Sequence, residues 1–238
     1  MINGILIAIA NPNIVQDFFL FIDTETSGLP KNWTAPYDKE KNWPYIIQLA
    51  WVIFDQEYRE IKRANYFIKC TDFKIEKSSQ KIHHITEAFL MMNGGSREDA
   101  LEALNQDLIK YQPLVVGHFM EFDYHMVNAE HQRIGKPTEL NHLPLFCTMK
   151  ASAPFVNNPA KELLKLNEFY EELFNEAPEA FHQALADAIN TSRIFFELRK
   201  MGKVTAESIK QQNNNFTINH KASNPETAKS FISRLFSF

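Results

Sequence analysis

The sequence is poor in cysteine, lacks a long apolar run and carries no excess of positive charge. Its two cysteines, Cys70 and Cys147, are not in a spacing typical of metal sites, so we expect two reduced thiols in the core. The short apolar run at residues 5–10 lacks the basic start of a secretory signal and is too short to span a bilayer. We therefore expect a cytoplasmic protein with no membrane partner.

The charge balance argues against one class of nucleic-acid-binding protein. The formal net charge is −4 and the isoelectric point about 6.1, whereas a protein that coats nucleic acid is usually basic. An acidic protein can still act on a phosphodiester if a bound metal ion supplies positive charge. The 238 residues, 45% of them hydrophobic, suit one domain with a sizeable core.

Short apolar runs come first along the chain, and amphipathic segments follow them. Buried strands are predicted at residues 17–23, 45–54, 65–69 and 113–117 and near Leu145. Helices are predicted at residues 100–111, 122–134, 161–174 and 183–200. The first three strands are close enough in sequence for an antiparallel meander, with residues 55–63 as a polar connection. This order of elements predicts an α/β domain with a mixed sheet.

A polar segment at residues 31–44 follows directly after the first predicted strand. It holds Trp33, Tyr37 and Trp43. We expect a loop at the mouth of any site there, with these rings packed in the loop; stacking on single-stranded bases is the alternative.

The composition changes again near the C-terminal end. From residue 203 onward the chain is polar, so we expect residues 1–202 to form the domain and residues 203–238 a flexible tail. The tail ends in an apolar peptide at residues 230–238, a kind of segment that docks in grooves of partner proteins, although a tail without a partner is the simpler interpretation.

Two acids end the first predicted strand. Side chains alternate along a strand, so Asp23 and Glu25 point the same way, on the face that carries Phe19 and Phe21. Two carboxylates in such a setting repel each other and lose solvation, which is costly unless a cation or a proton neutralises them. Hard oxygen ligands suit Mg²⁺ or Mn²⁺. The alternative is a strand that ends in solvated acids.

Three more residues are candidates for the same site. Asp123 lies at the start of a predicted helix, where an acid alone would stabilise the helix by about 1 kcal/mol. The functional alternative has it facing the end of the first strand. His182 and Asp187 are five residues apart, and five residues turn an ideal helix by about 140°. The two can therefore meet at one site only if His182 precedes the first turn and Asp187 projects one turn in.

Together these signals resemble a known family. Asp-Thr-Glu-Thr-Ser-Gly from Asp23, Val-Gly-His-x-x-x-Phe-Asp ending at Asp123 and His-x-x-x-x-Asp ending at Asp187 appear in this order. They resemble the DEDDh family of 3′–5′ exonucleases, which includes the proofreading epsilon subunit of bacterial DNA polymerase III and ribonuclease T. The resemblance spans roughly residues 17–200. The sister group has Tyr where Gln183 stands, which favours the histidine class.

The resemblance implies a fold, a set of ligands and a base. The implied fold is ribonuclease H-like, with a central five-stranded mixed sheet flanked by helices. Two divalent ions, Mg²⁺ or Mn²⁺, would be held by the four acids Asp23, Glu25, Asp123 and Asp187. His182 would deprotonate the attacking water, since the unperturbed pKa of histidine suits a base at neutral pH. The product would be a nucleoside 5′-monophosphate.

The resemblance also implies substrate contacts around the 3′ end. The candidates for these contacts are Thr26, Gly28, Leu29, His84, His118 and Phe122, and for Phe122 and the two histidines packing in the fold is an equal or better interpretation. The sequence departs from the family pattern at Phe119, where many relatives have Asn, and at His84, where Gly is common.

Three functions remain open at this point. The first is a DNA exonuclease in proofreading or repair, acting on a 3′ end that is preferably single-stranded. The second is an exonuclease that trims RNA 3′ ends, because only contacts to the 2′-hydroxyl distinguish the substrates. The third is an inactive module that tethers a DNA polymerase or a sliding clamp.

Overall fold

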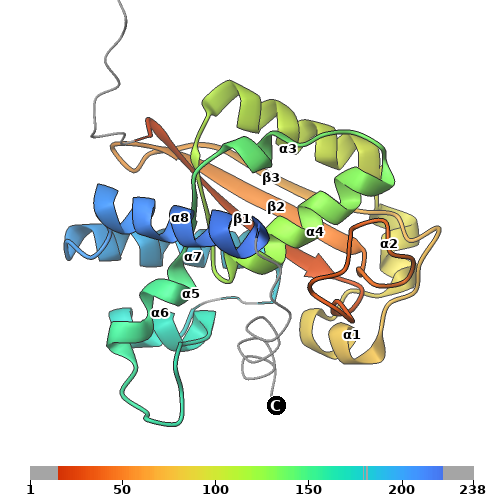
Figure 1. The fold of residues 1–238 in the computed structure, drawn as a ribbon. Helices are drawn as coiled ribbons and strands as arrows, with labels where there is room; N and C mark the ends of the chain where they lie inside the picture. The colour runs from red at the N-terminus through yellow and green to blue at the C-terminus, as the bar shows by residue number, and fades with distance from the viewer. Residues whose placement is uncertain (1–15, 179, 181, 222–238) are drawn as a thin grey trace, which may run out of the picture.

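The fold is built on one five-stranded sheet (Figure 1). The structure, a computed structural model, describes residues 16–221 except 179 and 181, with side chains up to residue 214. Its strands are β1 (Phe18–Thr26), β2 (Ile46–Asp55), β3 (Glu60–Phe67), β4 (Leu114–Gly117) and β5 (Leu145–Cys147). The strand order is β3-β2-β1-β4-β5. Strand β1 pairs antiparallel with β2 and parallel with β4, so the predicted mixed sheet and meander are confirmed.

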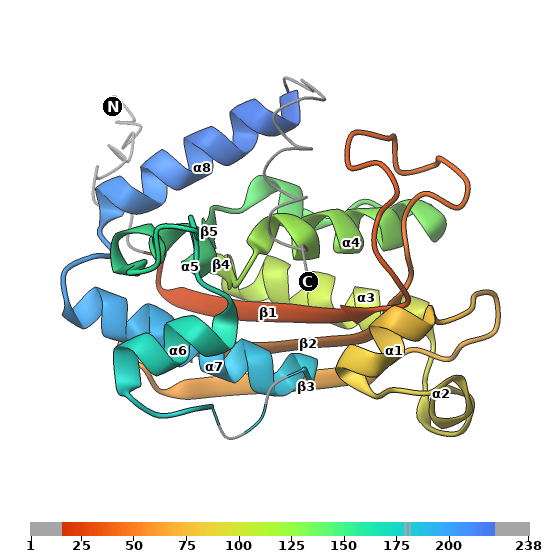
Figure 2. The same cartoon turned by 90° about the horizontal axis from the view of Figure 1, so that it is seen from below.

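Helices cover both faces of the sheet (Figure 2). They are α1 (Lys77–His83), α2 (Glu87–Asn93), α3 (Arg97–Tyr111), α4 (Met120–Arg133), α5 (Thr148–Ala151), α6 (Leu166–Phe174), α7 (Ala184–Lys200) and α8 (Ala206–Lys221), with short 3₁₀ turns at Glu139–His142 and Ala153–Phe155. Helices α3 and α4 contribute to the core on one face, and α6 and α7 to the core on the other. Among the described residues, none of these helices combines the length and apolar character that crossing a bilayer requires.

The alternation of side chains along β1 divides it between the two cores. Phe19 and Phe21 pack against α7, whereas Leu20 and Ile22 belong to the core beneath α3 and α4. All four side chains are at most 1% exposed. The same alternation carries on to the end of the strand, where it directs Asp23 and Glu25 to the side of α7.

The predicted flexible tail is wrong for the part of it that the structure describes. Residues Ala206–Lys221 form helix α8, which packs along β5. Its polar side chains bond to the strand: Cys147 N–H donates to Gln212 Oε1 at 2.9 Å, and Leu145 N–H donates to Asn213 Oδ1 at 3.2 Å. Polar residues thus satisfy the backbone of an edge strand. The predicted apolar peptide at residues 230–238 lies outside the described residues.

Other boundaries also differ from the predictions. Strand β3 begins at Glu60, inside the predicted connection, and residues 60–63 are exposed, so no apolar pattern marks them. Helix α6 begins at Leu166 rather than near residue 161. Helices α1 and α2 were not predicted, because each has only 7 residues and buries one of them.

Candidate active site

Three carboxylates meet at the end of β1. Oxygens of Asp23, Glu25 and Asp187 all lie within 4.8 Å of one another. Asp23 and Glu25 come from one face of β1, and Asp187 comes from the first turn of α7, which packs on that face. Asp187 is buried, whereas Asp23 and Glu25 are partly exposed, so the cluster is open to solvent on one side.

The position of Asp187 depends on how α7 begins. Ala184 N–H donates a hydrogen bond to Gln48 Oε1 at 3.2 Å, and Gln48 stands opposite Glu25 in the register of β1 and β2. His182 N–H donates to Asp187 Oδ2 at 3.0 Å. Because α7 starts at Ala184, His182 precedes the first turn and Asp187 projects from it, which is the arrangement that the five-residue spacing required.

Asp123 reaches the site from the other side of β1. It lies in the first turn of α4, where its Oδ1 accepts a hydrogen bond from the Thr24 hydroxyl at 2.8 Å. A Cβ atom at Gly117 would lie 3.1 Å from Asp123 Oδ2, so a glycine at the end of β4 gives this carboxylate its room. The charge of Asp123 acts on both Asp23 and Glu25, so this fourth acid lies near the cluster that the other three form.

The four acids are held in an arrangement that disfavours their ionisation. Burial, followed by the charges of Asp123, Asp187 and Glu25, raises the pKa of Asp23 well above its usual value. Burial is also the main cause that raises the pKa of Glu25 and of Asp123 to about 8. It raises the pKa of Asp187 to about 7. Clustered acids of this kind are common at functional sites.

This donor set fits a hard divalent cation. Its ligand atoms are carboxylate oxygens, which Mg²⁺ and Mn²⁺ prefer. Asp187 Oδ1 is buried and has no hydrogen-bond partner among the described residues. A cation beside the cluster would give this oxygen a partner and offset the repulsion that raises the four pKa values.

His182 stands next to the acids in an unusual backbone conformation. Its φ is 60°, in the left-handed region, and its N–H bonds to Asp187. Burial lowers the pKa of His182, and the nearby charges of His84 and Lys165 lower it further. The neutral ring, which can accept a proton, is therefore the main form at pH 7.

The loop that follows the acids is held closely against α1. We call residues 26–29 the nucleotide loop, because the family resemblance implies that they contact the terminal nucleotide. Thr26 Oγ1 donates a hydrogen bond to Gly28 O at 2.8 Å, and Glu76 N–H donates to Ser27 O at 2.8 Å. A Cβ atom at Gly28 would lie 2.7 Å from the carboxyl carbon of Glu76, so a larger residue there would have to displace this exposed side chain. Leu29 is 40% exposed at the end of the loop.

Of the remaining predicted substrate contacts, one is exposed near the site and two are packed in the fold. His84 is exposed at the C-terminal end of α1, close enough to His182 to affect its pKa. Phe122 is partly buried and packs against Phe119 and Trp33. His118 is buried and bonds through both ring nitrogens, to Thr148 Oγ1 at 3.0 Å and to Leu164 O at 3.1 Å. Because neither nitrogen is left for a substrate, we drop His118 from the proposed contacts.

The loop at residues 31–44 is packed against α4 rather than open. The Tyr37 hydroxyl lies 2.9 Å from His125 Nδ1, and the ring of Trp43 stacks on His125 with centroids 5.0 Å apart. Trp33 contacts Phe119 at 5.8 Å between ring centroids. Loop packing, the preferred interpretation of these aromatic rings, is what the structure has.

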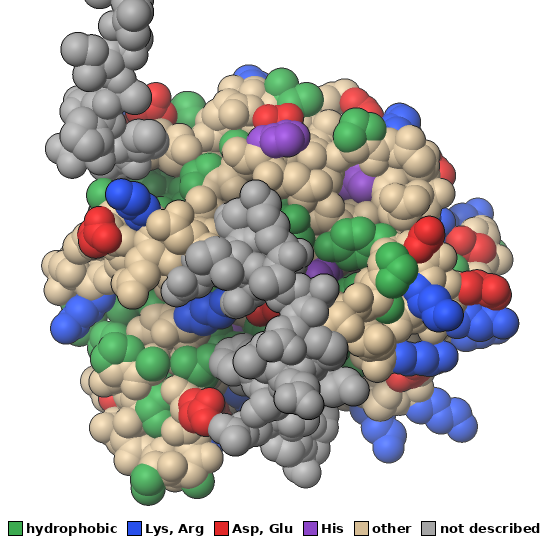
Figure 3. Space-filling view, viewed as in Figure 1, with side chains coloured by type: hydrophobic (Ala, Val, Ile, Leu, Met, Phe, Trp, Pro, Cys, Tyr) green, Lys and Arg blue, Asp and Glu red, His purple; other side chains and the backbone are tan. Residues whose placement is uncertain are grey.

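Lysine and arginine side chains gather on the side of the molecule where α1 and α2 lie (Figure 3). Lys74, Lys77 and Lys81 are all exposed there. Lys74 pairs with Glu87 at 3.1 Å. This side therefore carries local positive charge, although the net charge of the chain is negative.

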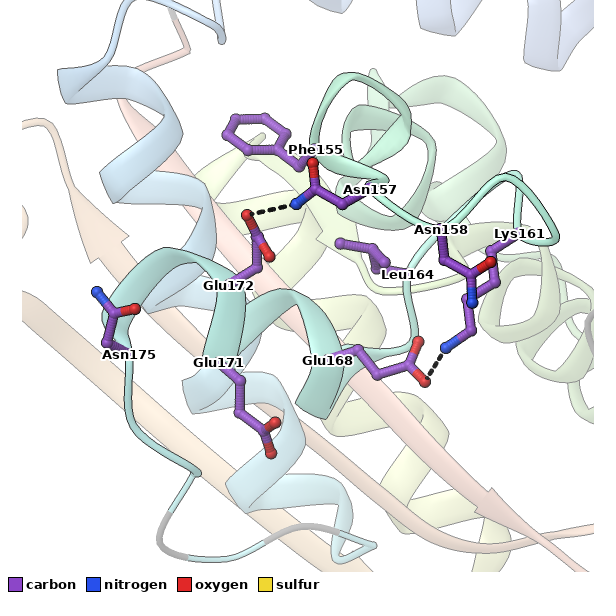
Figure 4. Close-up of a pocket in the computed structure, with 9 residues that line it drawn as sticks. All are labelled: Phe155, Asn157, Asn158, Lys161, Leu164, Glu168, Glu171, Glu172 and Asn175. Carbon is purple, nitrogen blue, oxygen red and sulfur yellow. Dashed lines mark hydrogen bonds and ion pairs between the residues drawn. The ribbon is translucent and has the colours of Figure 1, made fainter.

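A cavity of about 370 Å³ lies elsewhere, beside α6 (Figure 4). It is lined by Phe155, Asn157, Asn158, Lys161, Leu164, Glu168, Glu171, Glu172 and Asn175. None of these residues belongs to the carboxylate cluster, and Lys161 is paired with Glu168 at 2.6 Å. The cavity is therefore separate from the candidate active site.

Sequence reasoning missed several residues that build the site. Thr24, Gln48 and Gly117 carry no chemistry that a motif search would select, and each acts through a contact between distant segments. Thr24 and Gly117 do stand inside two of the recognised motifs, which was the one available signal.

Comparisons with known proteins identify the family and the fold of the chain. The model of the exonuclease family RNase_T matches residues 20–195. No sequence among curated proteins matched the chain. Several solved structures did match, and they confirm the predicted ribonuclease H-like fold.

Three of these structures illustrate the likeness. E. coli Exonuclease I in complex with a dA16 oligonucleotide has a TM-score of 0.61 and 17% identity, over 78% of this chain and 41% of that chain. The nuclease domain of 3′hExo, a DEDDh family member bound to rAMP, has a TM-score of 0.61 and 15% identity, over 81% and 96%. Cell-death related nuclease 4 has a TM-score of 0.57 and 15% identity, over 78% and 64%. The matched part thus spans about two fifths of Exonuclease I.

Proposed function

The chain belongs to the RNase_T exonuclease family. From this premise we propose that it is a 3′–5′ exonuclease of the DEDDh type, which removes nucleoside 5′-monophosphates from the 3′ ends of single-stranded DNA with two divalent metal ions. The observation that carries this proposal is the cluster of three acids from β1 and α7, with Asp123 of α4 near enough to act on it by its charge. Folding alone gives no reason to collect four acids there, since their mutual repulsion is unfavourable.

The four acids would hold the cations, Mg²⁺ or Mn²⁺. Divalent ions there would lower the pKa of a water molecule and stabilise charge on the leaving 3′ oxygen. Asp187 Oδ1 and the partly exposed oxygens of Asp23 and Glu25 are the ligand atoms best placed for them. Thr24 keeps Asp123 turned toward the cluster through its hydrogen bond.

His182 would act as the general base. Its lowered pKa keeps the ring neutral at pH 7, so it can take the proton of the attacking water. Its backbone hydrogen bond to Asp187 keeps it beside the acids whatever its side-chain rotamer. Its place before the first turn of α7 gives the ring freedom to turn toward the substrate.

The nucleotide loop would bind the terminal nucleotide. Gly28 lets a substrate approach the backbone, and the exposed side chain of Leu29 would wedge against the last base. His84 is placed to contact a phosphate, and the neighbouring Lys81 adds positive charge. Phe122, which packs against Phe119, would form one wall of the space for the terminal nucleotide.

RNA is the second candidate substrate. The likeness to Exonuclease I, whose structure holds a dA16 oligonucleotide, supports DNA as the substrate. The likeness to 3′hExo, which matches along 96% of its length and is described bound to rAMP, supports RNA. We place DNA first and assign the chain to proofreading or repair, and we count α8 as part of the catalytic domain because it packs along β5. A polymerase or clamp partner belongs to the same proposal.

The experiment compares Asp23→Asn with the wild-type protein on matched DNA and RNA oligomers labelled at the 5′ end. We expect the wild type to shorten the DNA in steps of one nucleotide with Mn²⁺, and Asp23→Asn to leave it intact. Asp38→Asn, an exposed acid in a second Asp-x-Glu triplet, is the matched control and should keep full activity. Cleavage by Asp23→Asn would contradict the metal assignment, faster cleavage of RNA would favour the second candidate, and an inactive wild type would favour a tethering module.

A further inference from the structure

The nucleotide loop is tied to an aromatic residue that no catalytic motif contains. Ser27 N–H donates a hydrogen bond to Tyr45 O at 2.8 Å, and Tyr45 N–H donates to Ser27 Oγ at 2.9 Å. These two bonds run in opposite directions between the same two residues. The position of the loop backbone therefore follows the position of Tyr45.

The ring of Tyr45 is itself held by contacts from two other segments. It stacks on Phe73 with centroids 4.7 Å apart and planes inclined by 13°. The guanidinium carbon of Arg133, in α4, lies 4.0 Å from its centroid, and that of Arg97, in α3, lies 5.1 Å away. Phe73 belongs to the segment leading to Glu76, which bonds to the loop from its other side.

A buried carboxylate fixes the two arginines. Glu130 is fully buried, and it pairs with Arg133 at 2.8 Å and with Arg97 at 2.7 Å. Its Oε1 also accepts the backbone N–H of Ile46 at 2.8 Å. Arg133 donates a further hydrogen bond to Trp43 O at 2.6 Å. A charged group buried with this many partners has few alternative positions, because losing any of them is costly.

We propose that Tyr45, Arg133 and Glu130 are positioning residues that hold the nucleotide loop in the conformation that binds the 3′-terminal nucleotide. This inference rests on the proposed function, since it concerns the same site. The network reaches β2 only at Ile46, opposite Thr26 of the loop. Asp23 and Glu25 pair with Ala50 and Gln48, further along β2, and Asp187 is placed by α7. Loss of the network should therefore weaken the binding of the substrate and leave the binding of metal intact.

The test separates these two effects in the full-length chain. Tyr45→Ala removes the ring, and Arg133→Lys keeps a charge beside Glu130 but cannot repeat the two hydrogen bonds and the ring contact of arginine. We expect both variants to raise KM for a 3′ oligonucleotide end by about tenfold while kcat changes by less than about threefold. Calorimetry should show unchanged affinity for Mn²⁺, and Tyr45→Phe, which keeps the ring, should restore the KM of the wild type.

A general loss of stability is excluded by a control of the same kind. Lys62→Gln breaks a pair with a buried acid, Asp107, at 2.7 Å, far in the chain from the nucleotide loop. It should lower the unfolding temperature without changing KM. An unchanged KM in Arg133→Lys, or an equal rise of KM in Lys62→Gln, would overturn the inference while the exonuclease activity of the wild type stands. A wild type that cleaves no 3′ end would instead overturn the proposed function, and this inference with it.

Discussion

Thr24 donates a hydrogen bond to Asp123 at 2.8 Å, which joins the middle residue of the first acidic motif to the acid of the second. Because side chains alternate along β1, Thr24 points to the face opposite to that of Asp23 and Glu25. The acid from α4 therefore approaches the end of the strand from the α4 side, while the acid from α7 approaches from the other. The hydroxyl group of Thr24 thus connects β1, which carries Asp23 and Glu25, to the acid from α4.

Replacing Gly117 with alanine should impair catalysis more than folding. The added Cβ would lie 3.1 Å from Asp123 Oδ2 and 3.1 Å from Met120 Sδ, so the carboxylate must shift. The shift is smaller than the displacement of about 1 Å that costs a catalytic group about 100-fold, so we expect the cleavage rate of Gly117→Ala to fall by about 10-fold. At Gly95 an added Cβ meets nothing within 4 Å, so Gly95→Ala is the matched control and should keep the rate of the wild type. A Gly117→Ala enzyme with normal kinetics would contradict this account.

The metal-free protein should lose stability as the pH rises. Folding raises the pKa of Asp123 from 3.8 to about 8, so between these values the folded state binds more protons than the unfolded state. Stability is then highest at low pH and is lost as the pH rises through this window. With a chelator present, Asp123→Asn should unfold at a higher temperature than the wild type, with a larger difference at pH 8 than at pH 5.

Added Mn²⁺ should reverse that order at pH 8, because the wild type gains a bound cation that the variant holds less well. Thermal unfolding followed by circular dichroism measures both effects. A wild type more stable than Asp123→Asn in the chelator at pH 8 would show that the cluster is not under charge strain.

The acid limb of the pH–rate profile should depend on His84. The charges of His84 and Lys165 lower the pKa of His182, which keeps the base active below the usual range. His84→Asn should raise the pKa of His182 and move the acid limb of kcat to higher pH. Asparagine is the suitable replacement because position 84 has a φ of 58°, which asparagine adopts readily. His182→Ala should lower kcat by at least about 100-fold with little change in Mn²⁺ affinity. An acid limb that stays in place in His84→Asn would show that the charge of His84 does not act on His182.

Phe119→Asn should destabilise the protein although it suits the backbone better. Phe119 has a φ of 76°, a conformation that costs a non-glycine residue about 1–2 kcal/mol and that asparagine tolerates. The ring is only 6% exposed, however, and loss of a buried Phe ring costs about 3–5 kcal/mol. The loss of packing outweighs the relief of strain, so we expect a lower urea midpoint. Lys41→Asn changes an exposed residue with a φ of 54°, and it should keep or raise that midpoint.

The parts of the site that the sequence predicts depend on the regular spacing of side chains along a strand or a helix. The alternation along β1 placed Asp23 and Glu25 on one face, and the five-residue spacing required His182 to precede α7. Both conclusions follow from the geometry of a single element, which a sequence contains. The mixed sheet followed in the same way from the order of the apolar runs.

The parts that sequence could not predict depend on contacts between elements. The approach of Asp123 relies on Thr24 and on the space at Gly117, and no local pattern reports either contact. Helix α8 is rich in Asn and Gln, a composition typical of flexible tails, yet two of those side chains find partners on β5. Strand β3 begins earlier in the chain than the predicted strand at residues 65–69, because its first half is exposed on both faces and shows no apolar pattern.

The amide groups of α8 also limit how copies of this protein can join. Gln212 both accepts from Cys147 N–H and donates to Cys147 O, so it occupies the backbone of β5 as a neighbouring strand would. Within the described part of the chain, β3 is then the sheet edge whose outer side has no partner strand. If two copies join through β3, neither copy has a second open edge to which a third could add. Strand addition can therefore form a pair of sheets but not a fibre.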